Sequence, residues 1–386
     1  MRKIYFISGA RSEFDILAPV ISYCGTYGVD AQVILCAAHL SPFHGMGIDQ
    51  VREQGYSIAG AIESLLCSES VSGRSLSFST LLDGLTRFLS VNRPDVICVA
   101  GDREEALAGA LVGTFLGIHV AHLFGGDRCI AADIDEVFRP AISKLAHFHL
   151  TATDSHRNRL VRMGEYPENV WTVGGTGLDG LIGLNDVADE ELSNRFSVDI
   201  SQPFFLVIHH PTPTFGVEGT ECEMLSVLKG VLATGVRIFC SYPNFDPGNM
   251  GIRRAIDAVT EANPNQMVRY HNLPREVFAA LYRRATGIVG NSSSIIIEAG
   301  FLKKPGILCG PRQDLRECGP HIIRVASEDT AAITAACRRA MEDTDFLETI
   351  AHSDSLYGDG HAGERVAHIL STIPLTEEVL RKTNAY

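Results

Sequence analysis

The sequence lacks several features that would quickly place it in a functional class. Its ten cysteines include no CxxC pair, so neither a zinc-ligand spacing nor a redox motif is present. No apolar run approaches the roughly 18 residues that a membrane span requires. Lys and Arg number 33 against 46 Asp and Glu, and the net charge of −13 argues against general nucleic-acid binding. An anionic substrate stays compatible with that charge, because a pocket can be locally positive on an acidic protein.

The composition is that of a folded protein, with 45% hydrophobic and 20% charged residues. At about 150 residues per domain, the 386 residues predict two or three domains. The apolar run at residues 3–9 is too short for a signal peptide, so we predict a buried first strand. We expect a cytoplasmic protein without a metal site. The cysteines in strand-like runs are predicted to be buried, reduced thiols, namely Cys36, Cys98, Cys240 and Cys309.

Apolar β-rich runs alternate with segments of helical periodicity. Many runs are apolar at consecutive positions, which indicates burial on both faces, as in a parallel sheet. Strands are predicted at residues 3–9, 31–37, 95–101, 119–124, 147–153, 170–175, 204–210, 237–243, 267–271, 287–291, 306–310 and 321–326. Helical spacing lies between them, for example at residues 75–90, 104–117 and 329–343. The alternation predicts an α/β fold with two Rossmann-like, doubly wound domains.

A polar segment near residues 184–200 separates the two sets of strands. It predicts an N-terminal Rossmann-like domain at 1–186 and a C-terminal, nucleotide-binding one at 187–386. For the last helix, the alternative is that it packs back on the N-terminal domain. Because open α/β sheets bind ligands at the carboxyl ends of their strands, we expect an inter-domain cleft lined by residues that follow strands.

Three segments in the first half meet this criterion. Arg11 lies beside a helix start, where an arginine suits a phosphate or carboxylate, although a solvated loop arginine is the alternative. Asp102 and Arg103 follow another strand, where Asp102 equally suits a helix N-cap. Asp135 and Arg139 are four residues apart and can share a helical face, or can form an ordinary surface ion pair.

Two segments in the second half also follow strands. His209 and His210 end a strand, and the period of two puts their rings on opposite sides. A histidine there is an acid/base candidate, since its ordinary pKa lies near neutrality, although a satisfied core histidine is the alternative.

Residues 287–300 combine a strand, a glycine, three serines and a helix. Serine hydroxyls and free N–H groups at a helix start form an anion site, which we predict at Ser292 and Ser293. Glu298, about one and a half turns further on, can accept hydrogen bonds from a ribose diol. Serine N-capping is the alternative. Arg312 and Arg316 add positive charge on the next loop.

Together these segments resemble the hydrolysing UDP-N-acetylglucosamine 2-epimerases of sialic acid synthesis, including relatives that act on legionaminic acid precursors. The resemblance covers nearly the whole chain and is specific through the order and spacing of its motifs. They are SGARSEFD, AGDREEA, HLFGGD to DEVFRPAISKL, HHPTPT, GNSSSIIIEAG, GPRQDLRE and YGDGHAGER. The resemblance implies a GT-B-like architecture with two Rossmann-like domains around a nucleotide-sugar cleft.

The resemblance also implies a chemistry. A base removes the proton at sugar carbon 2 while UDP leaves from carbon 1, and water then attacks the resulting 2-acetamidoglucal. The matching catalytic positions are Asp102, Asp135, Arg139, His210 and, at the end of the GGD loop, Asp127. The positions matching nucleotide or phosphate contacts are Arg11, Arg103, Asn244, Ser292, Ser293, Glu298 and Arg312.

The implied partners are a UDP-sugar substrate and the product UDP, with no cofactor, nucleic acid or membrane. The resemblance also suggests a homodimer or homotetramer. The apolar segment at residues 104–117 suits a subunit contact, although plain core packing explains it equally well.

The chain departs from the family in one loop. Phe124 stands where relatives have Glu or His, Asp127 is shorter than the usual Glu, and the loop is longer at Cys129 and Ile130. An apolar ring at position 124 suits a 6-deoxy sugar or an extra acetamido group, and it equally suits transfer of the acid role to Asp127 or Asp135.

The leading hypothesis is hydrolysis and epimerisation of UDP-N-acetylglucosamine to N-acetylmannosamine and UDP. The alternatives are the same chemistry on UDP-2,4-diacetamido-2,4,6-trideoxyglucose or a GDP analogue, a GT-B glycosyltransferase, and a non-catalytic nucleotide-sugar sensor. The acidic and histidine residues favour catalysis over sensing.

Overall fold

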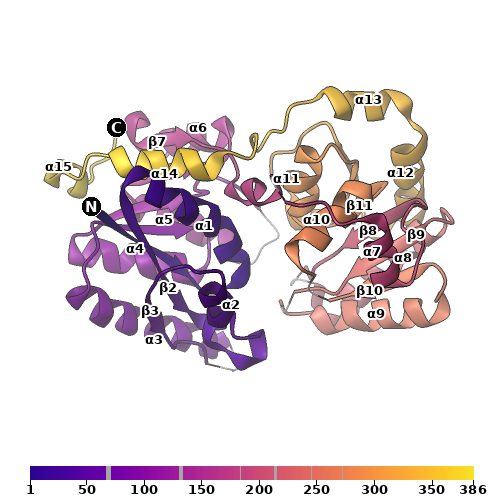
Figure 1. The fold of residues 1–386 in the computed structure, drawn as a ribbon, viewed down its shortest axis with the longest axis horizontal. Helices are drawn as coiled ribbons and strands as arrows, with labels where there is room; N and C mark the ends of the chain where they lie inside the picture. The colour runs from indigo at the N-terminus through magenta and orange to yellow at the C-terminus, as the bar shows by residue number, and fades with distance from the viewer. Residues whose placement is uncertain (67–70, 130–133, 183, 213–214, 245, 272) are drawn as a thin grey trace. The chain divides into compact units, whose positions relative to one another are not determined.

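The computed structural model describes residues 1–386 except 67–70, 130–133, 183, 213–214, 245 and 272. The chain divides into two compact units, each built on one parallel sheet (Figure 1). Unit 1 comprises Met1–Asp127, Ile134–Ile182 and Tyr357–Tyr386. Unit 2 comprises Arg128–Asp133 and Gly183–Leu356. The C-terminal segment thus belongs to the same unit as the N-terminus.

Unit 1 contains a seven-stranded parallel sheet in the order β3-β2-β1-β4-β5-β6-β7. The strands are β1 (Arg2–Ser8), β2 (Val29–Cys36), β3 (Ile58–Ile62), β4 (Val96–Ala100), β5 (His119–Leu123), β6 (Phe148–Thr151) and β7 (Val170–Thr172). Strands are added outward in one direction from β1 to β3 and in the other from β4 to β7. The point where this direction reverses, between β1 and β4, is the switch point at which doubly wound sheets bind ligands.

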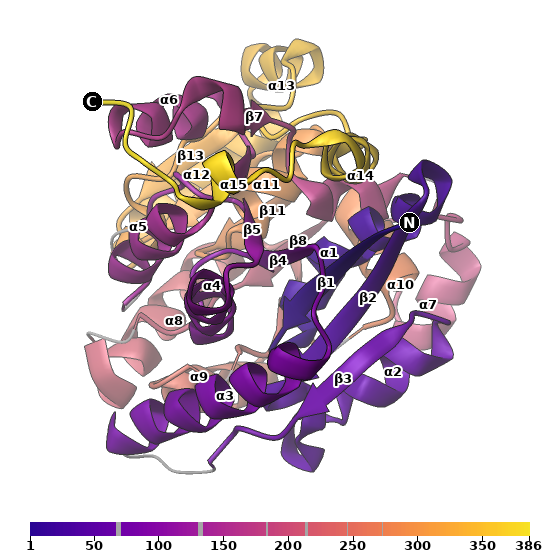
Figure 2. The ribbon, with the colours of Figure 1, turned by 90° about the vertical axis from the view of Figure 1, so that its left-hand side faces the viewer.

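Helices cover both faces of this sheet (Figure 2). One face packs against α1 (Arg11–Cys24), α2 (Gly47–Glu53) and α14 (Ala362–Thr372), and the other against α3 (Val71–Val91), α4 (Glu104–Leu116) and α5 (Asp135–Leu145). The remaining helices are α6 (Asp154–Arg162) and α15 (Glu377–Leu380). Neighbouring residues alternate between the two cores, with Phe6 in the first and Ile7 in the second. This two-sided burial explains why the inner strands are apolar at consecutive positions.

Strand β3 was not predicted from the sequence. It pairs with β2 at the edge of the sheet, and Ile62 is its one buried residue. Gly60 lies where a side chain would collide with the ring of Phe88. An edge strand with a small residue at its centre lacks the apolar run that marks the inner strands.

Helix α4 packs within unit 1, where Ala106, Ala108, Ala110 and Val112 are buried in the core. The structure therefore favours core packing as the reason for its apolar sequence. Phe115, at the end of the same helix, is 83% exposed.

Unit 2 contains a six-stranded parallel sheet in the order β10-β9-β8-β11-β12-β13. The strands are β8 (Phe204–Ile208), β9 (Arg237–Ser241), β10 (Met267–Tyr270), β11 (Gly287–Gly290), β12 (Gly306–Cys309) and β13 (Ile322–Val325). Its helices are α7 (Asp189–Phe196), α8 (Gly216–Leu232), α9 (Asn249–Ala262), α10 (Arg275–Arg284), α11 (Ser294–Phe301), α12 (Thr330–Glu342) and α13 (Thr344–His352). Helices α8, α9 and α12 pack on one face of the sheet. The switch point of this sheet lies between β8 and β11.

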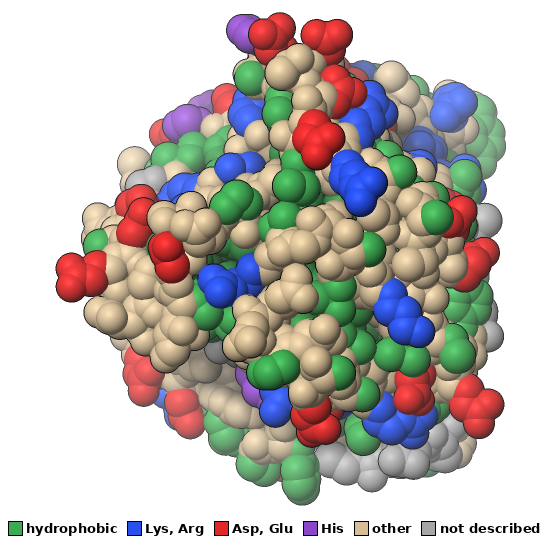
Figure 3. All heavy atoms as spheres, turned by 90° about the vertical axis from the view of Figure 1, so that its right-hand side faces the viewer, with side chains coloured by type: hydrophobic (Ala, Val, Ile, Leu, Met, Phe, Trp, Pro, Cys, Tyr) green, Lys and Arg blue, Asp and Glu red, His purple; other side chains and the backbone are tan. Residues whose placement is uncertain are grey.

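The predicted fold class, two doubly wound parallel-sheet units, is confirmed. The cysteines predicted to be buried thiols are buried and unpaired, namely Cys36, Cys98, Cys240 and Cys309. Among the described residues, no helix is both long and apolar enough to cross a membrane. On the face drawn in Figure 3, acidic and basic side chains are interspersed. This mixed pattern differs from the basic face typical of nucleic-acid binding.

Candidate functional site

Both switch points are lined by polar residues that immediately follow strands. In unit 1 these residues follow β1 and β4, and in unit 2 they follow β8 and β11. Because the amide groups and side chains at such a point face away from the sheet, they are available to a ligand.

In unit 1, a buried ion pair joins the end of β4 to helix α5. Arg139, whose side chain is 6% exposed, forms an ion pair with Asp102. Its other terminal nitrogen donates a hydrogen bond to the Phe124 carbonyl at 3.0 Å. Arg139 therefore bridges the ends of β4 and β5, so that Asp102 is held in one orientation. Asp135 is the first residue of α5 and is half-buried.

A buried histidine, His122, stabilises this arrangement, and the sequence analysis did not select it. His122 Nε2 lies 2.8 Å from the Gly101 carbonyl, and Nδ1 lies 3.0 Å from Ser143 Oγ. Burial lowers the pKa of His122 to about 3, so the ring is neutral. It fixes the turn directly before Asp102.

Phe124 adopts a left-handed backbone conformation, with φ of 63°. A bulky side chain rarely takes this conformation, and such strain is often found at functional sites. The Arg139 hydrogen bond to its carbonyl helps to hold it. Two residues on, Gly126 is followed by Asp127, whose Oδ1 lies 3.3 Å from Nε2 of the buried His156. Ile130, in the predicted insertion, lies outside the described residues.

Two arginines follow β1 and β4. Arg11 is the first residue of α1 and is exposed. Arg103 is 50% exposed, and its Nε lies 3.8 Å from Glu13 Oε1 and 3.5 Å from Glu105 Oε2. Both guanidinium groups are therefore within reach of an anion from solvent.

In unit 2, the two histidines after β8 face different surroundings. His209 is fully buried, with Nε2 3.3 Å from Glu223 Oε2. His210 is half-buried, and its Nδ1 accepts a hydrogen bond from the Asn244 backbone N–H at 3.3 Å. Burial, and then the charge of Arg312, lowers the pKa of His210 to about 3. His210 is thus a neutral ring with its proton on Nε2, which makes it a hydrogen-bond donor.

Three loops meet around His210. Arg312 donates to the Pro211 carbonyl at 3.2 Å, and another of its nitrogens lies 3.4 Å from Asp246 Oδ2. The Asn244 side-chain amide donates to the same carboxylate at 2.7 Å. The structure thus brings together the predicted residues His210, Asn244 and Arg312, with Asp246 as a common acceptor that the sequence did not reveal.

Asn291 connects β11 to β8 and was also missed. It is fully buried; its Oδ1 accepts from the His210 N–H at 2.7 Å, and its Nδ2 donates to the His210 carbonyl at 2.8 Å. The preceding Gly290 has a φ of 136°, and a Cβ there would collide with the Ile208 carbonyl. The available signal was a polar residue directly after a glycine-ended strand at the switch point.

The serine segment precedes helix α11. Ser292 Oγ accepts hydrogen bonds from the backbone and hydroxyl of Ser294, at 3.3 Å and 3.0 Å. Ser293 is the N-cap residue, but its side chain makes no capping hydrogen bond. Its hydroxyl is thus suited to an anion. The backbone N–H groups of Ser294, Ile295 and Ile296 already donate to Ser292 and Ser293. Glu298 is half-buried, and desolvation raises its pKa.

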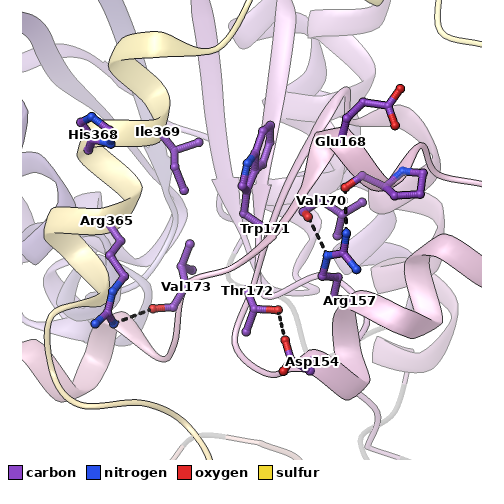
Figure 4. Close-up of a pocket in the computed structure, with 11 residues that line it drawn as sticks. Asp154, Arg157, Glu168, Val170, Trp171, Thr172, Val173, Arg365, His368 and Ile369 are labelled. Atoms are coloured by element: carbon purple, nitrogen blue, oxygen red, sulfur yellow. Dashed lines mark hydrogen bonds between the residues drawn. The ribbon is translucent and has the colours of Figure 1, made fainter.

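A separate cavity of about 580 Å³ lies at the edge of unit 1, beside β7 (Figure 4). Trp171 and Ile369 line it together with Arg157 and Arg365, and none of the predicted site residues does. Arg157 there donates to the Val170 carbonyl at 3.0 Å, and Arg365 donates to the Val173 carbonyl at 3.3 Å. These arginines cap carbonyls along this edge of the sheet, so we assign the cavity no role in the reaction. Within the described part of the chain, no group of three or more His, Cys, Asp or Glu could hold a metal ion.

Two doubly wound sheets, each with charged and polar residues at its switch point, define a GT-B-like class of protein. Solved structures support this fold: UDP-GlcNAc 2-epimerase from Neisseria meningitidis, bound to UDP-GlcNAc, is 21% identical with a TM-score of 0.80, and the match covers 95% of this chain and 99% of that one.

The family description "UDP-N-acetylglucosamine 2-epimerase" matches residues 25–371. UDP-N,N'-diacetylbacillosamine 2-epimerase (hydrolyzing) of Legionella pneumophila is 33% identical over 387 residues, covering 100% of both chains. GDP/UDP-N,N'-diacetylbacillosamine 2-epimerase (hydrolyzing) of Campylobacter jejuni is 28% identical, covering 81% of each. The chain belongs to the UDP-N-acetylglucosamine 2-epimerase family, as its sequence motifs predicted, and is thereby a nucleotide-sugar 2-epimerase.

Proposed function

We propose that the protein is a hydrolysing 2-epimerase of a UDP-linked 2-acetamido sugar. The observation that carries this proposal is the buried Asp102–Arg139 pair at the switch point of unit 1. A merely structural ion pair does not require this position, whereas a reaction that moves a proton at a sugar carbon requires an oriented carboxylate.

In the proposed reaction, a carboxylate takes the proton from carbon 2, and UDP leaves from carbon 1 with the electron pair of the C1–O bond. Water then adds its hydroxyl to carbon 1 of the glycal, and carbon 2 regains a proton on the opposite face. We assign these proton transfers to Asp102, Asp127 and Asp135. Asp102 is oriented by Arg139, and Asp127 lies beside buried His156.

We assign nucleotide binding to the unit 2 residues. The Ser293 hydroxyl, the positive end of the α11 dipole and the guanidinium of Arg312 stabilise phosphate charge. Glu298 accepts from the ribose. His210, as a neutral Nε2–H donor, is better suited to bonding a diphosphate oxygen than to removing a proton. Arg11 and Arg103 supply further positive charge in unit 1.

For the sugar, we favour a 2,4-diacetamido-2,4,6-trideoxy hexose over N-acetylglucosamine. Two observations support this choice: the named substrate of the full-length relative from Legionella pneumophila, and the apolar Phe124 at the end of β5. UDP-N-acetylglucosamine is the second candidate, because it is the substrate in the family's description.

The test is to incubate the purified protein with UDP-N-acetylglucosamine, UDP-N,N'-diacetylbacillosamine and the GDP form of the latter, without an acceptor. The expected result is release of UDP and a free sugar inverted at carbon 2, fastest with the UDP-diacetamido sugar. Preference for UDP-N-acetylglucosamine would select the second candidate. No release from any donor would contradict the proposal.

A further inference from the structure

The carboxyl groups of Glu13 and Glu105 are buried next to Arg103, and the proposed reaction uses neither of them. Glu13 on α1 is 7% exposed and Glu105 on α4 is 6% exposed. Carboxylates are rarely buried this deeply unless they are paired or hydrogen-bonded. Their position, at the ends of β1 and β4, places them at the switch point of the unit 1 sheet.

Gly9 is where the two side chains come together. Glu13 Oε2 accepts hydrogen bonds from the backbone N–H groups of Gly9 and Ala10, at 2.7 Å and 3.2 Å. The Glu105 carboxyl occupies the space that a side chain at position 9 would fill. Position 9 therefore requires glycine, because any side chain there would collide with the Glu105 carboxyl group.

The guanidinium group of Arg103 lies within 4 Å of both carboxyl groups. Arg103 Nε is 3.8 Å from Glu13 Oε1 and 3.5 Å from Glu105 Oε2. If both carboxyls were ionised, the three groups would carry a net charge of −1 in a buried environment. Two like charges beside one guanidinium repel each other, which raises the cost of ionising both.

The surroundings favour the neutral form of Glu13. Desolvation, and then the charge of Glu105, raises the pKa of Glu13 to about 8, while Arg103 opposes this shift. The thiol of Cys36 on β2 also faces the pair, and its pKa is raised well above its usual value, so it adds no charge. His39 bonds the neighbouring Ser8 hydroxyl at 2.9 Å, and burial lowers its pKa to about 4, so it is neutral as well. Of these three neighbours, Arg103 is therefore the one whose charge counters the pair.

We propose that Glu13 and Glu105 are positioning residues that hold Arg103 and share a proton, so that an anion bound at Arg103 is accompanied by proton uptake. The inference rests on the proposed function, in which Arg103 supplies positive charge for an anionic nucleotide sugar. Half of the Arg103 side chain is exposed, so an anion can reach it from solvent. A bound anion adds negative potential and interacts with the same guanidinium group. Both effects make the second carboxylate less stable, so they favour its protonation. By linkage, the anion binds more tightly at a pH where the pair holds its proton.

Calorimetric titration of the intact protein with UDP tests the coupling. Titrations at pH 8 in buffers of different ionisation enthalpy measure the protons taken up per UDP. At this pH the terminal phosphate of UDP, with a pKa of about 6, is already ionised and contributes little. The wild type should take up protons on binding UDP, and its UDP affinity should fall as the pH rises from 7 to 9.

Glu105→Gln keeps the shape at Gly9 and removes one carboxyl, so it should bind UDP without proton uptake and with little pH dependence over this range. Glu104→Gln is the matched control. Glu104 is the preceding residue and forms an ion pair with Arg74, so this variant should keep the uptake. A purely structural role for Glu105 would change stability without changing proton uptake.

UDP binding to the wild type without proton uptake would overturn the inference, as would uptake retained in Glu105→Gln. Inorganic pyrophosphate separates this result from failure of the proposed function. If pyrophosphate binds with proton uptake but no nucleotide sugar is hydrolysed, the carboxyl pair stands and the proposed function falls. If neither UDP nor pyrophosphate binds, both fall.

Discussion

Replacing Asp102 with Asn should impair both stability and turnover. Asn keeps the size of the side chain and one acceptor for Arg139, but it removes the charge that neutralises a guanidinium only 6% exposed. Breaking a buried ion pair by removing one partner costs about 3–5 kcal/mol. Because Asp102 is 18% exposed and the amide still accepts a hydrogen bond, we expect a smaller loss, about 1–3 kcal/mol.

The same variant should lower turnover about a hundredfold or more, the scale of a lost acid or base, while UDP still binds. Chemical denaturation measures the stability change, and UDP release from the preferred donor measures turnover. Asp83→Asn is the matched control, because Asp83 forms an exposed ion pair with Arg87 on α3. It should leave both quantities unchanged. Wild-type turnover and stability in Asp102→Asn would refute the role of the pair.

Four other outcomes are expected. Ser293→Ala should weaken UDP binding by about 1.5–3 kcal/mol, and Glu298→Ala should weaken UDP more than pyrophosphate; unchanged titrations would argue against this nucleotide site. EDTA should leave turnover intact, because arginines and the helix start can neutralise the diphosphate; loss that Mg²⁺ restores would contradict this. Light scattering should find a homodimer or homotetramer at micromolar concentration rather than a monomer. Thermal stability should fall as the pH drops from 7 to 5, because two buried histidines take up protons only in the unfolded chain: His122, and His147, whose Nδ1 accepts from the Val120 N–H at 3.0 Å. Burial lowers their pKa values to about 3 and about 4 in the folded protein, and a flat profile would contradict this.

The inner strands could be predicted from the sequence because strands buried on both faces carry apolar residues at consecutive positions. All five residues of β4 are buried, as are all five of β5. Strand β3 gave no such signal, since its pairing with β2 depends on the completed sheet and only Ile62 is buried. Edge strands are formed by their neighbours as much as by their own residues.

The strand ends that carry the candidate site residues could be predicted, but the pairing of their side chains could not. Asp102 and His210 could be chosen because they follow strands, and strand ends are visible in the sequence. The pairing of Arg139 with Asp102 could not be predicted. Asp102 lies 37 residues before Arg139 in the sequence, whereas Asp135 lies in the same helix as Arg139. Burial of charged residues was also hidden: Glu13 lies between Ser12 and Phe14 in the sequence, and only the folded structure buries it beside Glu105.

The most direct test of the proposed function is the reaction run in D₂O with the nucleotide sugar that the protein turns over fastest. If a base removes the proton at carbon 2 and water adds to a glycal, the released sugar carries deuterium at carbon 2 and is inverted there, which NMR detects. Released sugar with hydrogen retained at carbon 2 and unchanged configuration would show direct hydrolysis and would contradict the account.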